Sequence, residues 1–202
     1  RCIVTDAALV SIQMLMSGRG TCKVCLGDNL MTVPGVAELL LLVNGIVIKR
    51  TGPPRELLRA TQATSRYIDA QIQHDRYSVW ISQRPGRTKD GDDRADPAII
   101  KMLALGAGKS PQELADLHIV PVAVSYEYEP CLSEKIRAAM LCQRNPLFTK
   151  LPGDDFAHMR SGVLKDKGRV HLAFGSQLSA AELTADSDDI YTHAANRIDR
   201  PY

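Results

Sequence analysis

The sequence lacks the features that would place the chain across a membrane or on nucleic acid. A transmembrane helix needs about 18 consecutive apolar residues, and the chain has no run of that length and no signal peptide. Its formal net charge is only +2 over 202 residues, which is too small to indicate a nucleic-acid partner. Any anion binding must therefore come from a local cluster of basic residues.

Cysteine is sparse and irregularly spaced. The five cysteines are Cys2, Cys22, Cys25, Cys131 and Cys142. An odd count at scattered positions argues against a disulfide framework and favours a reducing compartment. Cys22 and Cys25 form a lone C-x-x-C pair, whereas a zinc site needs a second ligand pair. We therefore expect ordinary buried thiols, no metal and no cofactor.

Repeats, low-complexity segments and nucleotide-binding glycine motifs are also missing. Without a G-x-G-x-x-G or Walker-type loop, a nucleotide-binding module is the weakest interpretation. The composition, 45% hydrophobic and 24% charged, fits one globular domain, which we assign to residues 1–202. The chain opens at Arg1 without an initiator methionine, inside what reads as a strand-to-helix unit, so we expect it to be truncated at its N-terminus.

Apolar periodicity predicts that helices and strands alternate along the chain. Helices are expected at 6–17, 35–44, 53–73, 97–108 and 180–199, and strands at 22–27, 45–50, 77–82, 118–128 and 168–179. This alternation favours an α/β fold in which helices flank a mostly parallel, mixed sheet. In such folds ligands bind beyond the carboxyl ends of the strands.

Three polar clusters are expected at those strand ends. They are Lys49 with Arg50, the loop "SQRPGRTKDGDDR" at 82–94, and the stretch from Ser125 to Glu129. In the loop, glycine lets the backbone approach a ligand closely, arginine presents a rigid fork of donors, and the turn amides can form an anion nest. The sequence therefore predicts a phosphate site there, with a simple solvated turn as the alternative.

The order of several segments resembles the glycerol-phosphate and lysophosphatidate acyltransferase family. The segments are "LGDNLMTVPGV", "NGIVIKR", "VWISQRPGRTKDGDDRADPAIIKMLAL", "IVPVAVSYEYEP" and the late "GDDFAHMRSGVLKDKGRVHLAFGSQLS". The resemblance covers nearly the whole chain and is closest to a bacterial branch whose block reads Ala-Gln-Arg-Glu-Gly-Arg-Ala-Lys-Asp-Gly, where this chain has "SQRPGRTKDG". It implies a glycerolipid acyltransferase-like fold.

The resemblance also implies an activity, that of an O-acyltransferase of phospholipid synthesis. Such enzymes move a fatty acyl group from acyl-CoA or acyl carrier protein to the hydroxyl of glycerol phosphate or a lysophosphatidate-type lysolipid. In the family a histidine is the general base on that hydroxyl, and an aspartate a few residues later orients the imidazole. Asp6 matches that aspartate.

The acceptor's phosphate site is implied in the same way. Family resemblance assigns it to the 83–88 block, through Gly86, Arg87 and Thr88, and to the strand-end bases Lys49 and Arg50. Charge-assisted contacts of this kind hold phosphate strongly.

Three departures from the family pattern affect the predicted site. The motif histidine would lie just before Arg1. With the spacing of more distant family members, Arg1 itself stands at the histidine position, and arginine cannot act as a base near neutral pH. Cys2 and Pro85 replace an aspartate and a glutamate that are usual in the pattern. The histidines present match no part of the motif and are expected to be surface or core residues: His74, His118, His158, His171 and His193.

Membrane contact is expected because acyl donors and lysolipids occur at membranes. The apolar segment 36–48 is too short to span a bilayer, and a buried helix and strand are its expected role, with part of it or of the helix at 53–73 facing the interface as the alternative. We expect a peripheral protein on the cytoplasmic face of the inner membrane. A non-catalytic lipid- or anion-binding homologue, and an acyltransferase for an amino-acid-containing lipid, remain alternatives.

Overall fold

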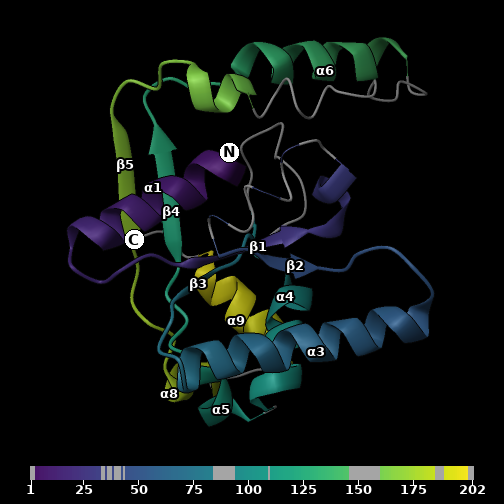
Figure 1. The fold of residues 1–202 in the computed structure, drawn as a ribbon, viewed down its shortest axis with the longest axis vertical. Helices are drawn as coiled ribbons and strands as arrows, with labels where there is room; N and C mark the ends of the chain where they lie inside the picture. The colour runs from purple at the N-terminus through teal and green to yellow at the C-terminus, as the bar shows by residue number, and fades with distance from the viewer. Residues whose placement is uncertain are drawn as a thin grey trace.

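Helices and strands alternate along the described chain (Figure 1). The computed structural model describes residues 3–32, 35, 38, 42, 44–83, 94–108, 110–145, 160–184 and 189–199. The helices are α1 (Ile3–Met16), α3 (Pro54–Gln73), α4 (Pro97–Ala107), α5 (Pro111–Ala115), α6 (Leu132–Arg144), α8 (Ala180–Thr184) and α9 (Ile190–Ile198). The strands are β1 (Lys23–Gly27), β2 (Ile46–Ile48), β3 (Val79–Trp80), β4 (Val122–Tyr126) and β5 (Val170–Phe174), and Asp28–Thr32 forms the 3₁₀ helix η1.

A small parallel sheet forms the first structural unit. Its strand order is β2-β1-β3, with Cys25 opposite Ile46 and Lys23 opposite Val79. The central strand β1 buries Val24, Cys25 and Gly27, as expected for a strand covered on both faces. The predicted α/β class, with helices around parallel strands, is therefore confirmed.

The last two strands do not join this sheet. β4 and β5 pair antiparallel in a sheet of their own, with Val122 opposite Phe174 and Tyr126 opposite Val170. Alternate residues of β4 are exposed, which is the pattern of an antiparallel sheet with one solvated face. The predicted single mixed sheet is corrected to a parallel sheet plus a separate antiparallel pair in the described part of the chain.

Helices α3 and α4 pack closely against each other. A Cβ added at Gly106 would lie only 2.4 Å from the backbone carbon of Ser65, so this approach requires glycine. The Ser65 hydroxyl is buried and donates a hydrogen bond of 3.0 Å to the Leu103 carbonyl oxygen. The crossing of α3 and α4 therefore combines close packing of the two backbones with a buried hydrogen bond.

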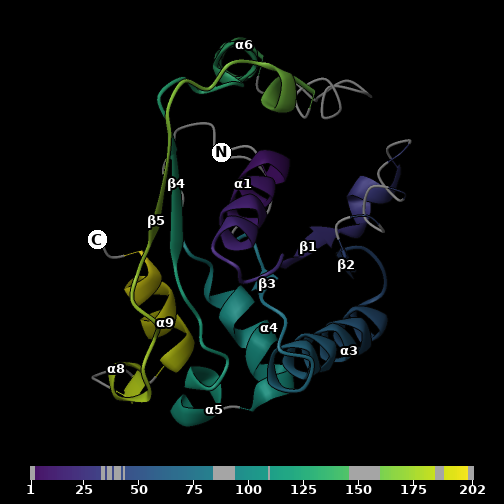
Figure 2. The ribbon, with the colours of Figure 1, turned by 60° about the vertical axis from the view of Figure 1, so that its left-hand side comes forward.

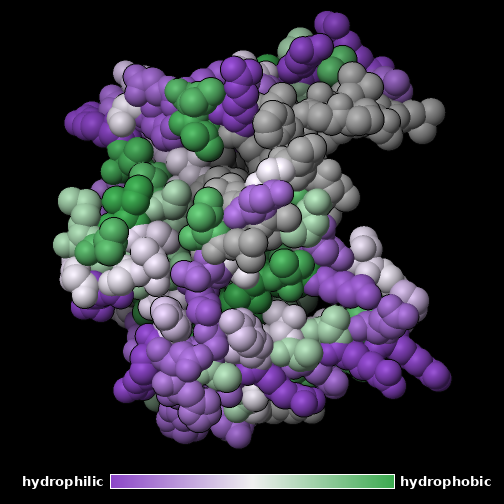
Figure 3. All heavy atoms as spheres, in the orientation of Figure 1, coloured by the Kyte–Doolittle hydropathy of each residue, from purple (hydrophilic) through white to green (hydrophobic). Residues whose placement is uncertain are grey.

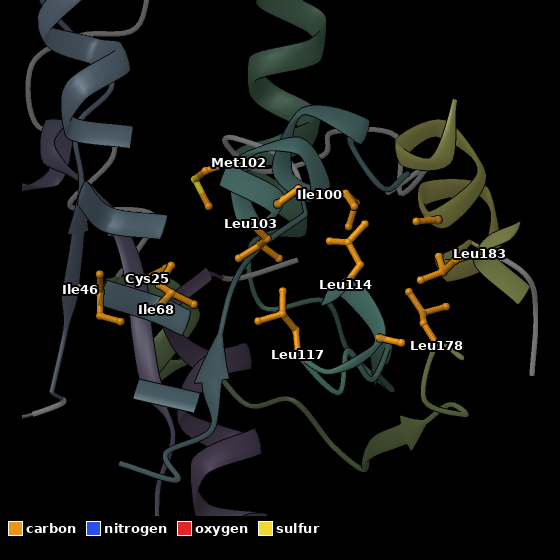
Figure 4. Packing of buried hydrophobic residues seen from close by; sticks show 13 residues of the cluster. Cys25, Ile46, Ile68, Ile100, Met102, Leu103, Leu114, Leu117, Leu178 and Leu183 are labelled. Atoms are coloured by element: carbon orange, nitrogen blue, oxygen red, sulfur yellow. The ribbon is translucent and has the colours of Figure 1, made fainter. Parts of the chain in front are cut away.

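The main core fills the space between these helices and the C-terminal ones. Figure 4 shows Ile100, Leu114, Leu178 and Leu183 gathered between α4, α5 and α8. Ile100 and Leu114 are completely buried. Burial of these side chains is the largest favourable contribution to folding in this part of the molecule.

Several boundaries differ from the sequence-based expectation. The strand expected at 118–128 is shorter because Pro121 immediately precedes β4, and the helix expected at 180–199 divides into α8 and α9. Most of the helix expected at 35–44 lies outside the described residues. Helices α5 and α6 were not predicted, although α5 carries a clear signal, a capping box between Ser110 and Glu113.

Helix α6 lies apart from the main core, beyond the ends of β4 and β5 (Figures 1 and 2). None of its residues is buried. It is joined to residues 161–165 by Glu134, which binds Lys165 Nζ at 2.7 Å and Ser161 Oγ at 2.8 Å. No helix within the described residues is both long and apolar enough to span a membrane.

Candidate functional site

A cleft of about 1530 Å³ opens between β3 and β4. Both strands lie at the edge of their sheets, and α1 lies beside β4 across the same space (Figure 2). The C-terminal ends of α3 and α9 complete its walls. Its volume exceeds the roughly 300–1,000 Å³ typical of small-molecule sites, so it can hold a ligand with a long apolar part.

Asp6 lies in the wall of this cleft. It belongs to the first turn of α1, where a carboxylate is favoured by the helix dipole. Its side chain is nevertheless buried, with 3% exposed, and its Oδ1 accepts a hydrogen bond from the Tyr126 hydroxyl at the end of β4. A solvated helix-start charge would need no such distant partner, so Asp6 is a positioned, buried carboxylate.

The predicted phosphate-binding residues Gly86, Arg87 and Thr88 lie outside the described residues, as does Pro85. The described residues that border 84–93, namely Gln83 at the start of the block and Arg94 beyond its end, both line the cleft. Asp6 and the two flanks of the block therefore share one cavity.

Lys49 and Arg50, the other residues predicted to bind phosphate, lie away from the cleft. Lys49 Nζ lies 3.1 Å from Glu56 Oε2 at the start of α3, and the backbone N–H of Arg50 donates to Asp28 Oδ1 at 3.1 Å. They follow β2, which lies on the far side of β1 from β3. Neither is among the described residues that line the cleft.

The cluster from Ser125 to Glu129 lies at the cleft, but on a sheet that the sequence did not predict. Its strand is antiparallel and belongs to the second sheet, yet Tyr126 and Glu129 line the cavity opposite Asp6's helix. Glu129 Oε2 lies 3.2 Å from Lys135 Nζ. The pairing of Tyr126 with Asp6 was missed because nothing in the local pattern joins residues 120 positions apart.

Two buried polar atoms of residues that line the cleft were also missed. Trp80 Nε1 and Gln83 Oε1 are buried and have no hydrogen-bond partner within the described structure. Trp80 is the only tryptophan of the chain, and a tryptophan beside a basic loop was the available signal. Buried unpaired polar atoms require an explanation, such as a ligand or a bound water.

An exposed apolar patch lies on α1 and β5. Ile12, Leu15 and Met16 of α1 and Phe174 of β5 are exposed, Met16 by 80%, and Figure 3 shows a hydrophobic patch over the end of α1 and β5. Phe174 also lines the cleft, whereas Ile12, Leu15 and Met16 are not among its lining residues. Arg19 and Arg76 line the cleft, are exposed, and form no ion pair within the described residues.

Histidines and cysteines give no catalytic pair with Asp6 in the described structure. His118 lines the cleft, with its Nδ1 2.9 Å from Gln177 Nε2, whereas His74, His171 and His193 do not line it and His158 lies outside the described residues. Cys22, Cys25 and Cys131 are buried, as predicted, whereas Cys142 is partly exposed and Cys2 lies outside the described residues. Burial raises the pKa of Cys22 and raises the pKa of Cys25 to about 12, so neither is a reactive thiolate.

No group of three or more metal-ligating side chains occurs among the described residues. The cleft therefore combines a buried carboxylate held by a tyrosine with a largely apolar wall. Comparisons of the chain with protein-family models, with curated proteins and with solved structures gave no match.

Proposed function

We propose that this protein is an O-acyltransferase that moves a fatty acyl group from acyl-CoA or acyl carrier protein to a hydroxyl of glycerol phosphate or a lysophosphatidate-type lipid. The observation that carries the proposal is the shared cavity: buried Asp6 lines the same cleft as Gln83 and Arg94, the two flanks of the basic block. The family resemblance assigns Asp6 and that block to the base-orienting and phosphate-binding roles. The cavity is also large enough for an acyl chain.

In the proposed mechanism Asp6 acts through an imidazole. The resemblance places that histidine immediately before Arg1. Tyr126 donates to one carboxylate oxygen and so fixes the plane of the Asp6 side chain. The ionised carboxylate then holds the imidazole in the tautomer that accepts the acceptor's proton and stabilises the imidazolium that forms. As the imidazole takes its proton, the hydroxyl oxygen attacks the thioester carbonyl. The C–S bond then breaks, and the leaving sulfur takes the proton from the imidazolium.

The test is acyl transfer by the natural full-length protein. Release of free CoA from oleoyl-CoA is measured with lysophosphatidate or glycerol 3-phosphate as acceptor. Asp6→Asn, which keeps an acceptor for Tyr126, should lower kcat by about 100-fold or more. Arg87→Ala should raise the KM for the acceptor by about tenfold with a smaller change in kcat. Asp28→Asn, which alters a carboxylate outside the cleft, is the matched control. Absence of turnover with every acceptor would remove the proposal.

A second candidate is a non-catalytic lipid- or anion-binding protein. The observation that favours it is Pro85, which stands in place of the glutamate usual in the family pattern. The same assay separates the two functions. Tight binding of lysophosphatidate without turnover by the full-length protein would support binding alone.

We further propose that the exposed apolar patch of α1 and β5 contacts an anionic membrane surface. Ile12, Leu15 and Met16 would enter the interface. The exposed cations Arg19 and Arg76, which form no ion pair among the described residues, would complement anionic head groups. Leu15→Ser should weaken co-sedimentation with vesicles of phosphatidylglycerol and phosphatidylethanolamine. Leu58→Ser on α3, which is exposed to a similar extent (54% against 60%), should leave it unchanged. Equal binding by both variants would contradict this orientation.

A further inference from the structure

Helix α6 carries an exposed stripe of apolar side chains. The apolar stripe consists of Leu132, Ile136 and Met140, which lie four residues apart and therefore along one face of the helix. These residues are exposed by 53%, 50% and 48% respectively. The apolar face of a helix in a globular protein is normally buried against the core, but no residue of α6 is buried. The apolar stripe is therefore largely open to solvent.

Two arginines lie beside the apolar stripe. Arg137 and Arg144 are exposed and form no ion pair among the described residues. They are seven residues apart, about 10 Å along the helix axis, and so lie on the same side of α6. A groove of about 440 Å³ brings them together with apolar residues, and it is lined by Ser133, Ile136, Arg137, Met140, Leu141 and Arg144. No acidic side chain occurs among these lining residues, so the surface is positively charged.

This surface lies next to the Asp6 end of the cleft. Helix α6 lies beyond the end of β4 in two views of the molecule (Figures 1 and 2). Lys135, which precedes Ile136, forms an ion pair of 3.2 Å with Glu129, and Glu129 lines the cleft. Tyr126, three residues before Glu129, donates its hydroxyl to Asp6. A macromolecule bound on α6 would therefore lie beside the carboxylate of the proposed mechanism.

The chemistry of the surface selects one kind of partner. An interfacial helix has a broad apolar face, often with aromatic residues, whereas α6 has no aromatic residue and only a narrow stripe. The patch at the end of α1 is a separate surface, because α1 runs away from α6 in both Figures 1 and 2. Apolar anchors at i, i+4 and i+8 are the pattern by which one helix binds another, and unpaired arginines complement acidic side chains. An acidic amphipathic helix of a partner protein therefore fits best.

We infer that α6 is the docking surface for the protein form of the acyl donor, an acyl carrier protein. An acidic helix of the carrier packs on the apolar stripe and pairs with Arg137 and Arg144. The inference rests on the proposed function for the identity of this partner, which must deliver an acyl thioester to the cleft. The docked carrier presents its thioester arm to the cleft at the end where Tyr126 and Asp6 meet.

The first experiment measures binding without requiring activity. A fluorescently labelled bacterial acyl carrier protein loaded with palmitate is titrated with the natural full-length protein, and anisotropy gives the affinity. The double variant Arg137→Glu, Arg144→Glu should bind at least about tenfold more weakly, because like charges then face each other. The matched control is Arg59→Glu, Arg66→Glu on α3, which has the same spacing and the same charge change at exposed positions. At about 0.15 M salt it should change the affinity by less than about twofold, since distant charges are screened.

A second pair of variants tests the apolar stripe separately from the charge. Ile136→Ser should weaken binding about fivefold, as expected for an apolar anchor of an interface. Leu58→Ser on α3, where the leucine is exposed to a similar extent (54% against 50%), should leave the affinity unchanged. Both substitutions replace exposed side chains, and circular dichroism checks that each variant is folded.

Activity measurements then compare the two forms of the donor. In the Arg137→Glu, Arg144→Glu variant, the KM for the palmitoyl carrier should rise about tenfold. The KM for palmitoyl-CoA should stay unchanged, because the docking surface contacts only the protein part of the donor.

The outcomes distinguish this inference from the proposed function. No binding of the palmitoyl carrier, or an affinity that survives either the arginine or the Ile136→Ser substitution, would overturn the docking surface even if the protein transfers acyl groups from CoA. Loss of binding to anionic vesicles with unchanged carrier affinity in the arginine variant would assign α6 to the membrane instead. Carrier binding that depends on both features in a protein without transferase activity would support the docking surface and remove the enzyme proposal.

Discussion

Two regions of the molecule are held together in different ways. The core region, made of α3, α4, α5, α8, α9 and the parallel sheet, surrounds one large cluster of buried side chains. The outer region, made of α6 and residues 160–165, buries none of the α6 side chains and is joined mainly by polar contacts around Glu134. The cleft lies between the strands β3 and β4, next to the core but lined partly by half-exposed strands. Apolar burial therefore fixes the scaffold, while polar contacts position the elements around it.

The largest expected difference between the regions comes from truncating an isoleucine in each. Ile100 is completely buried, whereas Ile136 of α6 is 50% exposed. Ile100→Ala should reduce the free energy of unfolding by about 2–5 kcal/mol because it removes buried surface and leaves a cavity. Ile136→Ala should change it by less than about 0.5 kcal/mol. Urea denaturation measures both. Similar losses would mean that α6 belongs to the same cooperative core.

The crossing of α3 and α4 should tolerate no added methyl group. Gly106→Ala would place a Cβ 2.4 Å from the backbone of Ser65. We expect a loss of about 1–3 kcal/mol in the free energy of unfolding, since helix displacement outweighs the better helix propensity of alanine. Thermal unfolding followed by circular dichroism checks this. A rise in Tm would show that the two helices separate at little cost in free energy.

A smaller effect is expected from two serine substitutions. Ser65→Ala removes the buried hydrogen bond to the Leu103 carbonyl oxygen and should cost about 1 kcal/mol. Ser133→Ala removes an exposed contact with Lys165 Nζ in the outer region and should be close to neutral. Chemical denaturation of the two variants in parallel measures the change in the free energy of unfolding. A larger loss for Ser133→Ala than for Ser65→Ala would contradict the prediction.

The smallest effects concern acid pH. Burial of Glu134 opposes its ionisation, but hydrogen bonds from Lys165, Ser161 and Ser133 prevail and lower its pKa to about 2. In the core region, the hydrogen bond from Arg197, with those from Ser179, lowers the pKa of Glu182 to about 2. Both contributions are complete above the ordinary value of 4.5 and are lost as the pH falls from 4.5 towards 2.

Glutamine variants can separate the two carboxylates. Glu134→Gln should weaken the contacts of the outer region at neutral pH, so that amide exchange in α6 becomes faster there and changes less as the pH falls. The core region should be unaffected. Glu182→Gln should act on the contact between α8 and α9. Titration of both carboxyl groups by NMR gives the pKa values directly, and an ordinary value near 4.5 for either would contradict the contacts described for it.

Much of the secondary structure could be predicted from local patterns. The amphipathic helix α3, the buried strand β1 and the alternation typical of an α/β fold follow from the spacing of apolar residues. The pairing of β4 with β5 could not be predicted, because an alternating strand is compatible with either sheet until its partner is known. Helix α6 was missed because its apolar residues are not buried and its pattern does not dominate the segment.

Only part of the candidate site could be predicted from the sequence. Asp6 could be singled out, and the segments beside the basic block could be placed at a strand end. Lys49 could be placed at a strand end too, but not its ion pair with Glu56 or its position away from the cleft. The burial of Trp80 Nε1 and Gln83 Oε1 without hydrogen-bond partners in the described structure could not be predicted, since it depends on the surroundings of each atom.

The sequence by itself determined which segments are helical or extended and where charge and apolar surface occur along the chain, because these depend on neighbours within a few residues. Tertiary structure alone decided that Tyr126 meets Asp6 and that two sheet edges enclose one cavity. Such contacts join residues far apart in the chain, and they form only when burial of the core brings those residues together.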